Sequence, residues 1–310
     1  MLLTAQLALL FVALWVSSSV IIKSVTKLSV KAKLPTFLVS FFLLGFLTSI
    51  SEISVAISSY LDGVPQISAG NLLGGIIVMF LLVLPLLAIL GNGISAESNY
   101  KPHELFITLT VLVLPALLFL DKQITPSEGY FLLGSYLIPV IILVAKNSDL
   151  PAKKGRIPNA VKSTNILLEI AKIVLGGVVL LYAADHLVDL LVISAQVLGI
   201  TPFILSLLTL SLGTNLPEII LVIKAVLTGN KEVALGNYIG SALMNLLILS
   251  FLAIANGGLS ISADFTKIFI FTSIGLVLFF SFITSKNVLT RKEGILLLLL
   301  YVAFLWTELL

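Results

Sequence analysis

The chain has 310 residues, of which 59% are hydrophobic and 11% are charged. An ordinary globular protein carries about 25% charged residues, so this composition excludes a soluble protein with a normally charged surface. The net charge is only +3, and the lack of cysteine excludes disulfides, thiolate metal sites and cysteine nucleophiles. Because the basic residues stand in short clusters between apolar runs, we expect a membrane protein and no nucleic-acid partner.

Apolar runs follow one another along the whole chain, and most are long enough to cross a hydrocarbon core of about 30 Å. We predict an all-α polytopic membrane protein with ten transmembrane helices, near residues 3–22, 36–60, 68–91, 103–120, 127–146, 164–184, 201–228, 232–256, 265–285 and 292–309. The first run resembles the core of a signal peptide. It has neither a positively charged start nor a small-residue cleavage site, so we expect it to be retained.

The basic residues indicate which loops face the cytoplasm. With the N-terminus outside, the inner loops would hold most of the 18 Lys and Arg residues, and the outer loops would hold only Lys122 and Lys267. This bias predicts a multi-pass protein of the cell membrane, surrounded by the lipid bilayer, with both termini outside. Residues 147–163 would then form a cytoplasmic linker between two five-helix halves, 1–146 and 164–310.

The two halves resemble each other in sequence. A shift of 166 residues places Thr48 on Thr214, Glu52 on Glu218 and Gly70-Asn71 on Gly236-Asn237. Since five spans is an odd number, the halves should insert in opposite directions, and a substrate site is expected near the midplane where they meet. The charges agree, because the first run ends in lysines whereas the sixth ends at Asp185, His186 and Asp189.

Two glutamates, Glu52 and Glu218, lie inside long apolar spans, whereas most of the 15 acidic residues stand in loops or at helix ends. A charge at that depth costs about 3 kcal/mol on insertion scales, which makes both residues functional candidates. Helical spacing would place beside them Thr48 and Ser49 in the first half, and Thr214 and Asn215 in the second. A further polar stripe, expected to begin at a helix N-terminus, consists of Asn237, Ser241 and Asn245.

Carboxylate, hydroxyl and amide oxygens together form a hard site that suits Ca²⁺, Mg²⁺, Mn²⁺ or Na⁺. Two neighbouring glutamates also suit a proton, because like charges resist ionising together. We therefore predict inorganic cations as partners, with no resident cofactor and no obligatory protein partner. The glycines at 70, 74, 75, 236 and 240 are expected to be close-packing positions, and Glu169 is expected to pair with Lys172 in a structural role.

The segments Gly213-Thr-Asn-Leu-Pro-Glu218 and Gly236-Asn-Tyr-Ile-Gly-Ser241, with Asn245, resemble the second repeat of the calcium/cation antiporter superfamily. The prokaryotic sodium/calcium exchanger branch is the most similar. Leu47-Thr-Ser-Ile-Ser-Glu52 and Gly70-Asn-Leu-Leu-Gly-Gly75 look like a degenerate first repeat. With the expected ten spans and inverted halves, the resemblance extends over essentially the full chain.

The resemblance implies a membrane antiporter, not an enzyme, that exchanges Ca²⁺ for Na⁺ by alternating access. By this resemblance, Glu52 and Glu218 would bind Ca²⁺ together with the backbone carbonyls of Thr48 and Thr214. Ser241 would help to bind Na⁺. Ser49 and Asn215 would line the same pocket, and Asn245 would lie between the glutamates.

The chain departs from the family at several of these positions. The family has Ser, Asn and Pro where this chain has Gly75, Met79 and Ser51, and it has Gly and Ser where this chain has Leu47 and Asn215. These losses leave the Na⁺ stoichiometry open, and they leave proton coupling or another divalent ion as alternatives. A small-solute transporter with a different inverted fold, an intramembrane enzyme and a non-transporting ion-binding scaffold are further alternatives.

Overall fold

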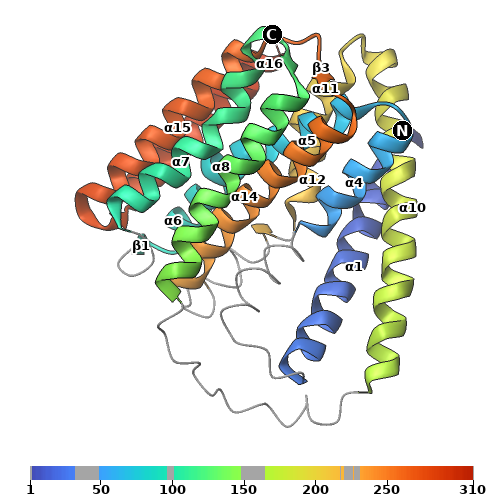
Figure 1. Cartoon of the computed structure of the whole chain (residues 1–310), viewed down its shortest axis with the longest axis horizontal. Helices are drawn as coiled ribbons and strands as arrows, with labels where there is room; N and C mark the ends of the chain where they lie inside the picture. Colours follow the sequence, from blue (N-terminus) through green and yellow to red (C-terminus); the bar gives the residue numbers. More distant parts are fainter. Residues whose placement is uncertain are drawn as a thin grey trace.

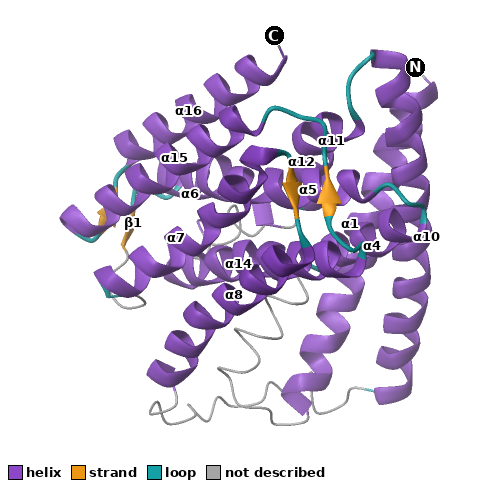
Figure 2. Ribbon diagram, turned by 45° about the horizontal axis from the view of Figure 1, so that its top comes forward, coloured by secondary structure: helices purple, strands orange, loops and turns teal. Residues whose placement is uncertain are grey.

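The computed structural model describes residues 2–31, 49–95, 101–147, 165–216, 218–219, 226 and 231–309. Within these ranges the protein is almost entirely helical (Figures 1 and 2). Five of the described helical segments are long and apolar enough to cross a membrane: Pro65–Leu90, Pro102–Asp121, Ile166–Leu198, Tyr238–Ala255 and Phe265–Lys286. The predicted linker lies outside the described residues except for its first residue, Asn147.

Two long helices, α1 (Leu2–Lys31) and α10 (Ile166–Leu198), lie side by side at one edge of the molecule (Figure 1). They have 30 and 33 residues, or about 45–50 Å at 1.5 Å per residue, which exceeds the hydrocarbon thickness. The predicted ends of these two spans, residues 22 and 184, were therefore wrong.

The caps of α10 explain its length. The side chain of Asn165 accepts hydrogen bonds from two backbone amides of the first turn, at 3.1 and 3.3 Å. The helix ends only at Gly199, whose φ of 68° is a conformation that favours glycine. Asp185, His186 and Asp189 were interpreted as the end of a span, but charged side chains do not break a helix, and it continues through them.

In the second and seventh predicted spans, helix boundaries lie a few residues before the glutamates. The helix α4 (Ile50–Leu61) begins after the N-cap residue Ser49. In the other half α11 (Pro202–Leu205), a π-helical segment η4 (Ser206–Leu210) and α12 (Ser211–Thr214) are followed by a break at Asn215. The Asn215 amide donates to the Ser211 carbonyl oxygen at 2.7 Å and so competes with the helical hydrogen bonds. The prediction of one continuous helix over 201–228 was therefore wrong, and 36–48 lie outside the described residues.

Two helices cross the centre of the molecule. One consists of α5 (Pro65–Val78), a π-helical segment η2 (Met79–Val83) and α6 (Leu84–Leu90), and the other is α14 (Lys231–Ala255). Both begin five residues before their Gly-Asn pair, so the prediction that the polar stripe starts at a helix N-terminus was wrong. A Cβ atom at Gly70 or Gly74 would clash with a backbone oxygen of α11 or η4, as the close-packing prediction requires. At Gly240 a Cβ atom would meet no described atom within 4 Å, so the prediction was wrong for that glycine.

Three helices form the opposite edge (Figure 1): α7 (Pro102–Leu118, continued by the turn η3, Phe119–Asp121), α15 (Phe265–Lys286) and α16 (Arg291–Leu309). The helix α8 (Pro126–Asn147) packs against α7 and α14. Two short antiparallel ribbons join their turns. In one, β1 (Ile94–Ser95) pairs with β4 (Val288–Leu289); in the other, β2 (Gln123–Ile124) pairs with β3 (Leu259–Ser260). Each ribbon thus connects the two halves of the chain.

The two ribbons are equivalent under a shift of 165 residues, which carries β1 onto β3 and β2 onto β4. The same shift carries Lys122 onto Asn287, and both have positive φ, at 69° and 54°. It also carries the N-terminal capping box of α8, Thr125 with Glu128, onto that of α16, Thr290 with Glu293. The labels of β1 and β3 lie far apart in Figure 1, so equivalent turns occupy different ends of the bundle.

The hydrophobic core has two parts. The larger cluster fills the space among α5, α6, α7, α14, α15 and α16. A separate, smaller cluster joins α1 to α10 through residues such as Leu14 and Leu187, and it reaches the other helices through Val55 and Leu210. The outer face of α10 is apolar and exposed, as a lipid-facing surface should be. The helices α1 and α10 therefore pack as a pair against the edge of the larger body.

Candidate functional site

Both predicted glutamates are buried where the helices break. Glu52 lies in the first turn of α4 and is 2% exposed, and Glu218 follows the break at Asn215 and is 1% exposed. Their two segments meet, because the hydroxyl of Ser51, next to Glu52, lies 3.5 Å from the backbone oxygen of Thr214. The structure therefore brings together two acidic groups from opposite halves of the chain.

The other predicted site residues that the structure describes are also buried. Thr48 lies outside the described residues. The remaining five, each 2% exposed or less, are Ser49, Thr214, Asn215, Ser241 and Asn245. Ser241 and Asn245 lie one turn apart on the same face of α14, as the spacing predicts, and Ser49 forms the N-cap of α4. The helix α12 ends at Thr214, but the chain is helical again at Leu216, and the amide of Ile219 donates to the backbone oxygen of Asn215 at 3.2 Å.

Ser51 is part of the site although the sequence did not single it out. Its hydroxyl donates a hydrogen bond to Oε2 of Glu52 at 2.9 Å and lies 3.5 Å from the backbone oxygen of Thr214. It therefore links the carboxylate of one half to the broken helix of the other. The only sequence signal was that this position departs from the family's proline.

Asn71 is a second residue that sequence reasoning missed. The hydroxyl of Thr214 donates to its Oδ1 at 3.0 Å, and Asn71 is fully buried on α5. Its alignment with Asn237 in the other half was the signal that pointed to it. Tyr238 also reaches the site, because its hydroxyl donates to the backbone oxygen of Glu218 at 3.4 Å.

Several buried oxygens lack a donor. Within the described part of the chain, the two carboxylate oxygens of Glu218 have no hydrogen-bond partner, and the amide oxygen of Asn215 has none either. Buried polar groups are nearly always hydrogen-bonded, and an exception calls for an explanation such as an ion. The same part of the chain contains no group of three or more His, Cys, Asp or Glu residues that could hold a metal. The site therefore offers two carboxylates and neutral oxygens, which suit a hard cation such as Ca²⁺ or Na⁺.

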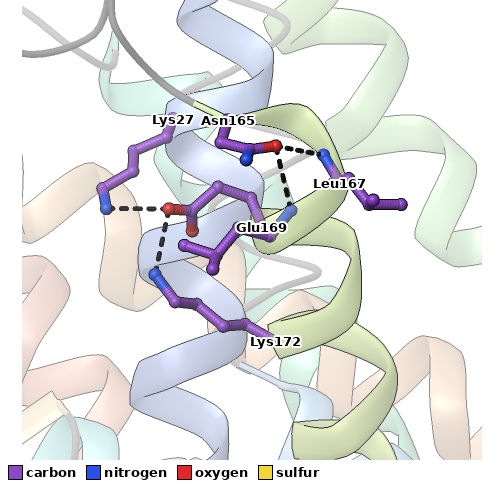
Figure 3. Close-up of polar contacts among 6 residues, drawn as sticks. Lys27, Asn165, Leu167, Glu169 and Lys172 are labelled. Carbon is purple, nitrogen blue, oxygen red and sulfur yellow. Dashed lines mark hydrogen bonds and ion pairs between the residues drawn. The ribbon is translucent and has the colours of Figure 1, made fainter.

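Glu169 belongs to a different cluster (Figure 3). It is 3% exposed, and its Oε1 accepts from Lys172 on the same helix at 3.1 Å, which confirms the predicted pair. The same oxygen also accepts from Lys27 of α1 at 3.1 Å, a contact that no sequence pattern indicated. Its role is therefore to join α1 to α10 rather than to line the carboxylate site.

Known proteins share both the sequence pattern and the fold. The family model for the sodium/calcium exchanger protein matches residues 2–145 and 168–310. The "Putative antiporter CaxA" of Alkalimonas amylolytica is 25% identical over 268 residues, which cover 83% of each chain. The crystal structure of the H⁺/Ca²⁺ exchanger CAX matches with a TM-score of 0.77 at 16% identity, over 98% of this chain and 82% of that one. The sodium-calcium exchanger NCX_Mj, soaked with Na⁺ and Sr²⁺, matches with a TM-score of 0.65 at 22% identity, over 97% of both chains.

The apolar helices and the fold, which is shared with the CAX and NCX_Mj structures, define a multi-pass membrane protein. The family match covers nearly the whole chain, so the chain belongs to the sodium/calcium exchanger protein family, within the calcium/cation antiporter superfamily. It is therefore a cation antiporter and not an enzyme, as the resemblance implied.

Proposed function

We propose that the protein is a secondary active antiporter that moves Ca²⁺ across the membrane in exchange for Na⁺. The observation that carries this proposal is the pair of buried carboxylates, Glu52 and Glu218, one from each half, beside amide and hydroxyl oxygens. Such burial is unfavourable for two ionised groups unless a cation neutralises them. A divalent ion matches the charge of both carboxylates at once.

Each site residue has a role in this proposal. Glu52 and Glu218 bind Ca²⁺ directly, with the backbone carbonyls of Thr48 and Thr214 as further oxygen ligands. Na⁺ occupies the same pocket when Ca²⁺ leaves, and its ligands include Ser241. Ser49 and Asn215 line the pocket, and Asn245 lies between the glutamates.

The packing of α1 and α10 supports a proposal for alternating access. The helices α1 and α10 share their own hydrophobic cluster and contact the larger body along its edge. This pair slides across the fixed carboxylate site and opens it first to one side of the membrane and then to the other. The start of α4 after Ser49 and the end of α12 before Asn215 are helix ends, which would lie beside the ion in this proposal.

The test is calcium flux in proteoliposomes. Glu52→Gln and Glu218→Gln each keep the side-chain volume but remove one charge, so either variant should lose Na⁺-driven uptake of radioactive calcium. Glu128→Gln is the matched control, because Glu128 belongs to the capping box of α8. Wild-type rates in both site variants would contradict the proposed site. Uptake driven by a pH gradient but not by a Na⁺ gradient would assign protons as the coupling ion.

The orientation is proposed on the same basis. We place the protein in the cell membrane with both termini outside, the halves 1–146 and 164–310 inverted, and 147–163 as a cytoplasmic linker. In support, each ribbon joins two turns that the charge rule assigns to the same side. The chain has no cysteine, so single cysteines can be labelled without background. An impermeant maleimide should label Asp121→Cys but not Gly155→Cys in intact cells, and the reverse pattern would contradict this orientation.

A further inference from the structure

Gly75 lies on α5 where two side-chain amides converge. A Cβ atom built at this position would clash with Nδ2 of Asn245 and would lie 3.3 Å from Nδ2 of Asn215. Gly70 and Gly74, on the same helix, instead face backbone oxygens of the neighbouring helix. Gly75 thus makes room for side chains of the candidate site, whereas the other two glycines allow helices to pack.

The two amides have a defined orientation. Nδ2 of Asn245 donates to the backbone oxygen of Leu72 at 3.4 Å, and Nδ2 of Asn215 donates to that of Ser211 at 2.7 Å. The nitrogen and oxygen of a carboxamide diverge from one carbon, so both oxygens point away from Gly75. The oxygen of Asn215 is buried and has no donor among the described residues.

The two halves differ here. The 166-residue shift places Gly75 on Ser241 and Met79 on Asn245, so the second half has polar side chains where the first has none. An amide from the second half fills the space that a side chain at position 75 would take. The first half therefore contributes to this part of the pocket by the absence of a side chain.

We propose that Gly75 is a positioning residue of the cation site, which holds the amides of Asn215 and Asn245 with their oxygens turned toward the ion. This inference rests on the proposed function, because it assigns these oxygens as Ca²⁺ ligands. Ca²⁺ takes six to eight oxygens, so two carboxylates alone do not complete its coordination. The amide oxygens add two neutral ligands to the carboxylates and to the backbone carbonyls of Thr48 and Thr214.

A methyl group at position 75 provides the test. The atom it would meet first is the end of the Asn245 side chain, which can turn away without moving the backbone. The Gly75→Ala protein should therefore fold, with a thermal midpoint close to that of the wild type. Its KM for Ca²⁺ should rise about tenfold or more, since hydrogen-bond-like contacts to a charge are lost, while kcat changes less.

A double-mutant cycle of Gly75→Ala with Asn245→Ala distinguishes a positioning role of Gly75 from a simple packing role. If Gly75 acts through the amide, Gly75→Ala should change the KM less than about threefold when Asn245 is already alanine. The matched control is Gly134→Ala on α8, where a Cβ atom meets nothing within 4 Å, and it should leave the KM unchanged.

An unchanged KM in Gly75→Ala, or an equal rise in both backgrounds, would overturn the inference. Either result would leave the proposed function standing, because the wild type would still carry Ca²⁺. Failure of the wild type to transport Ca²⁺ would instead contradict the proposed function itself.

Discussion

Thr214 contacts the site through two different atoms. Its hydroxyl donates to Oδ1 of Asn71 at 3.0 Å, and its backbone oxygen lies 3.5 Å from the hydroxyl of Ser51. The first contact orients a neighbouring helix, whereas the second places a carbonyl beside the Glu52 carboxylate. A substitution of the side chain can therefore affect stability without removing the proposed ligand.

We predict that Thr214→Val destabilises the protein by about 1–3 kcal/mol, because it leaves the buried Oδ1 of Asn71 without a donor. Thermal unfolding in detergent measures the loss, and Thr214→Ser, which keeps the hydroxyl, is the control. Calcium transport by the folded fraction should persist in both variants, since the backbone oxygen remains. Equal stability of the valine and serine variants would show that the hydroxyl contact contributes nothing.

At the scale of single residues, the sequence revealed the charged residues of the site but not the neutral residues that hydrogen-bond within that site. Glu52 and Glu218 could be predicted because a charge in an apolar run is costly and therefore rare. Ser51 and Asn71 carried no comparable signal, because a serine or an asparagine is inexpensive in a membrane helix. Their contacts arise only when the two halves meet, and they join residues 163 and 143 positions apart.

At the scale of elements, the sequence predicted where most helices lie but not where the two longest end. Apolar runs and the charges between them set the predicted limits, which stopped at Lys23 in the first run and at Asp185 in the sixth. Backbone propensity continues the helices through those residues until a glycine such as Gly199 permits a left-handed turn. Hydropathy did not locate the helix boundaries at Ser49 and Asn215 either. The sequence signal near the second of them was Pro217, which removes a backbone donor and was expected to disturb the helix beside Glu218.

Replacing the two lysines that pair with Glu169 should have strongly non-additive effects on stability. The Glu169 side chain is 4% exposed, whereas Lys27 and Lys172 are 46% and 41% exposed. Lys27→Met or Lys172→Met alone should cost about 1 kcal/mol or less, because the other lysine still neutralises the glutamate. The double variant should cost about 3 kcal/mol or more, because it leaves a buried charge unpaired.

Adding Glu169→Gln to the double variant should recover part of that loss. Thermal unfolding of the wild type, the two single variants, the double variant and this triple variant measures it. Additive lysine effects, or no recovery by the glutamine, would show that Glu169 is not held by both lysines.

At the scale of the whole molecule, the repeat was visible in the sequence and the structure extends it. The motif around each glutamate revealed the 166-residue shift, because paired polar residues are rare in an apolar chain. The ribbons and the left-handed turns at Lys122 and Asn287 follow a shift of 165, one residue less. Two-residue strands leave no sequence pattern, so the repeat of the ribbons was not predictable. The repeated Thr-x-x-Glu capping boxes were the signal that could have indicated it.

Charge balance leads to the last prediction, which concerns the whole transport cycle. Glu52 and Glu218 supply two negative charges, and the described residues hold no cluster of three acidic, histidine or cysteine groups. One Ca²⁺ or two Na⁺ neutralises the site, whereas a third Na⁺ would place an unpaired charge inside the bilayer. We therefore expect electroneutral exchange of two Na⁺ for one Ca²⁺, with a Hill slope for Na⁺ near two.

Proteoliposomes with a membrane potential set by K⁺ and valinomycin measure this directly. One net charge moved through 100 mV is worth about 2.3 kcal/mol, which would shift the equilibrium Ca²⁺ ratio about fiftyfold. An electroneutral exchanger should show no such shift, whichever monovalent ion is coupled, and Glu128→Gln should behave like the wild type. A fiftyfold response to the potential, or a Hill slope near three, would mean that a third monovalent ion binds. The ligands of that ion would then have to come from outside the pair of glutamates.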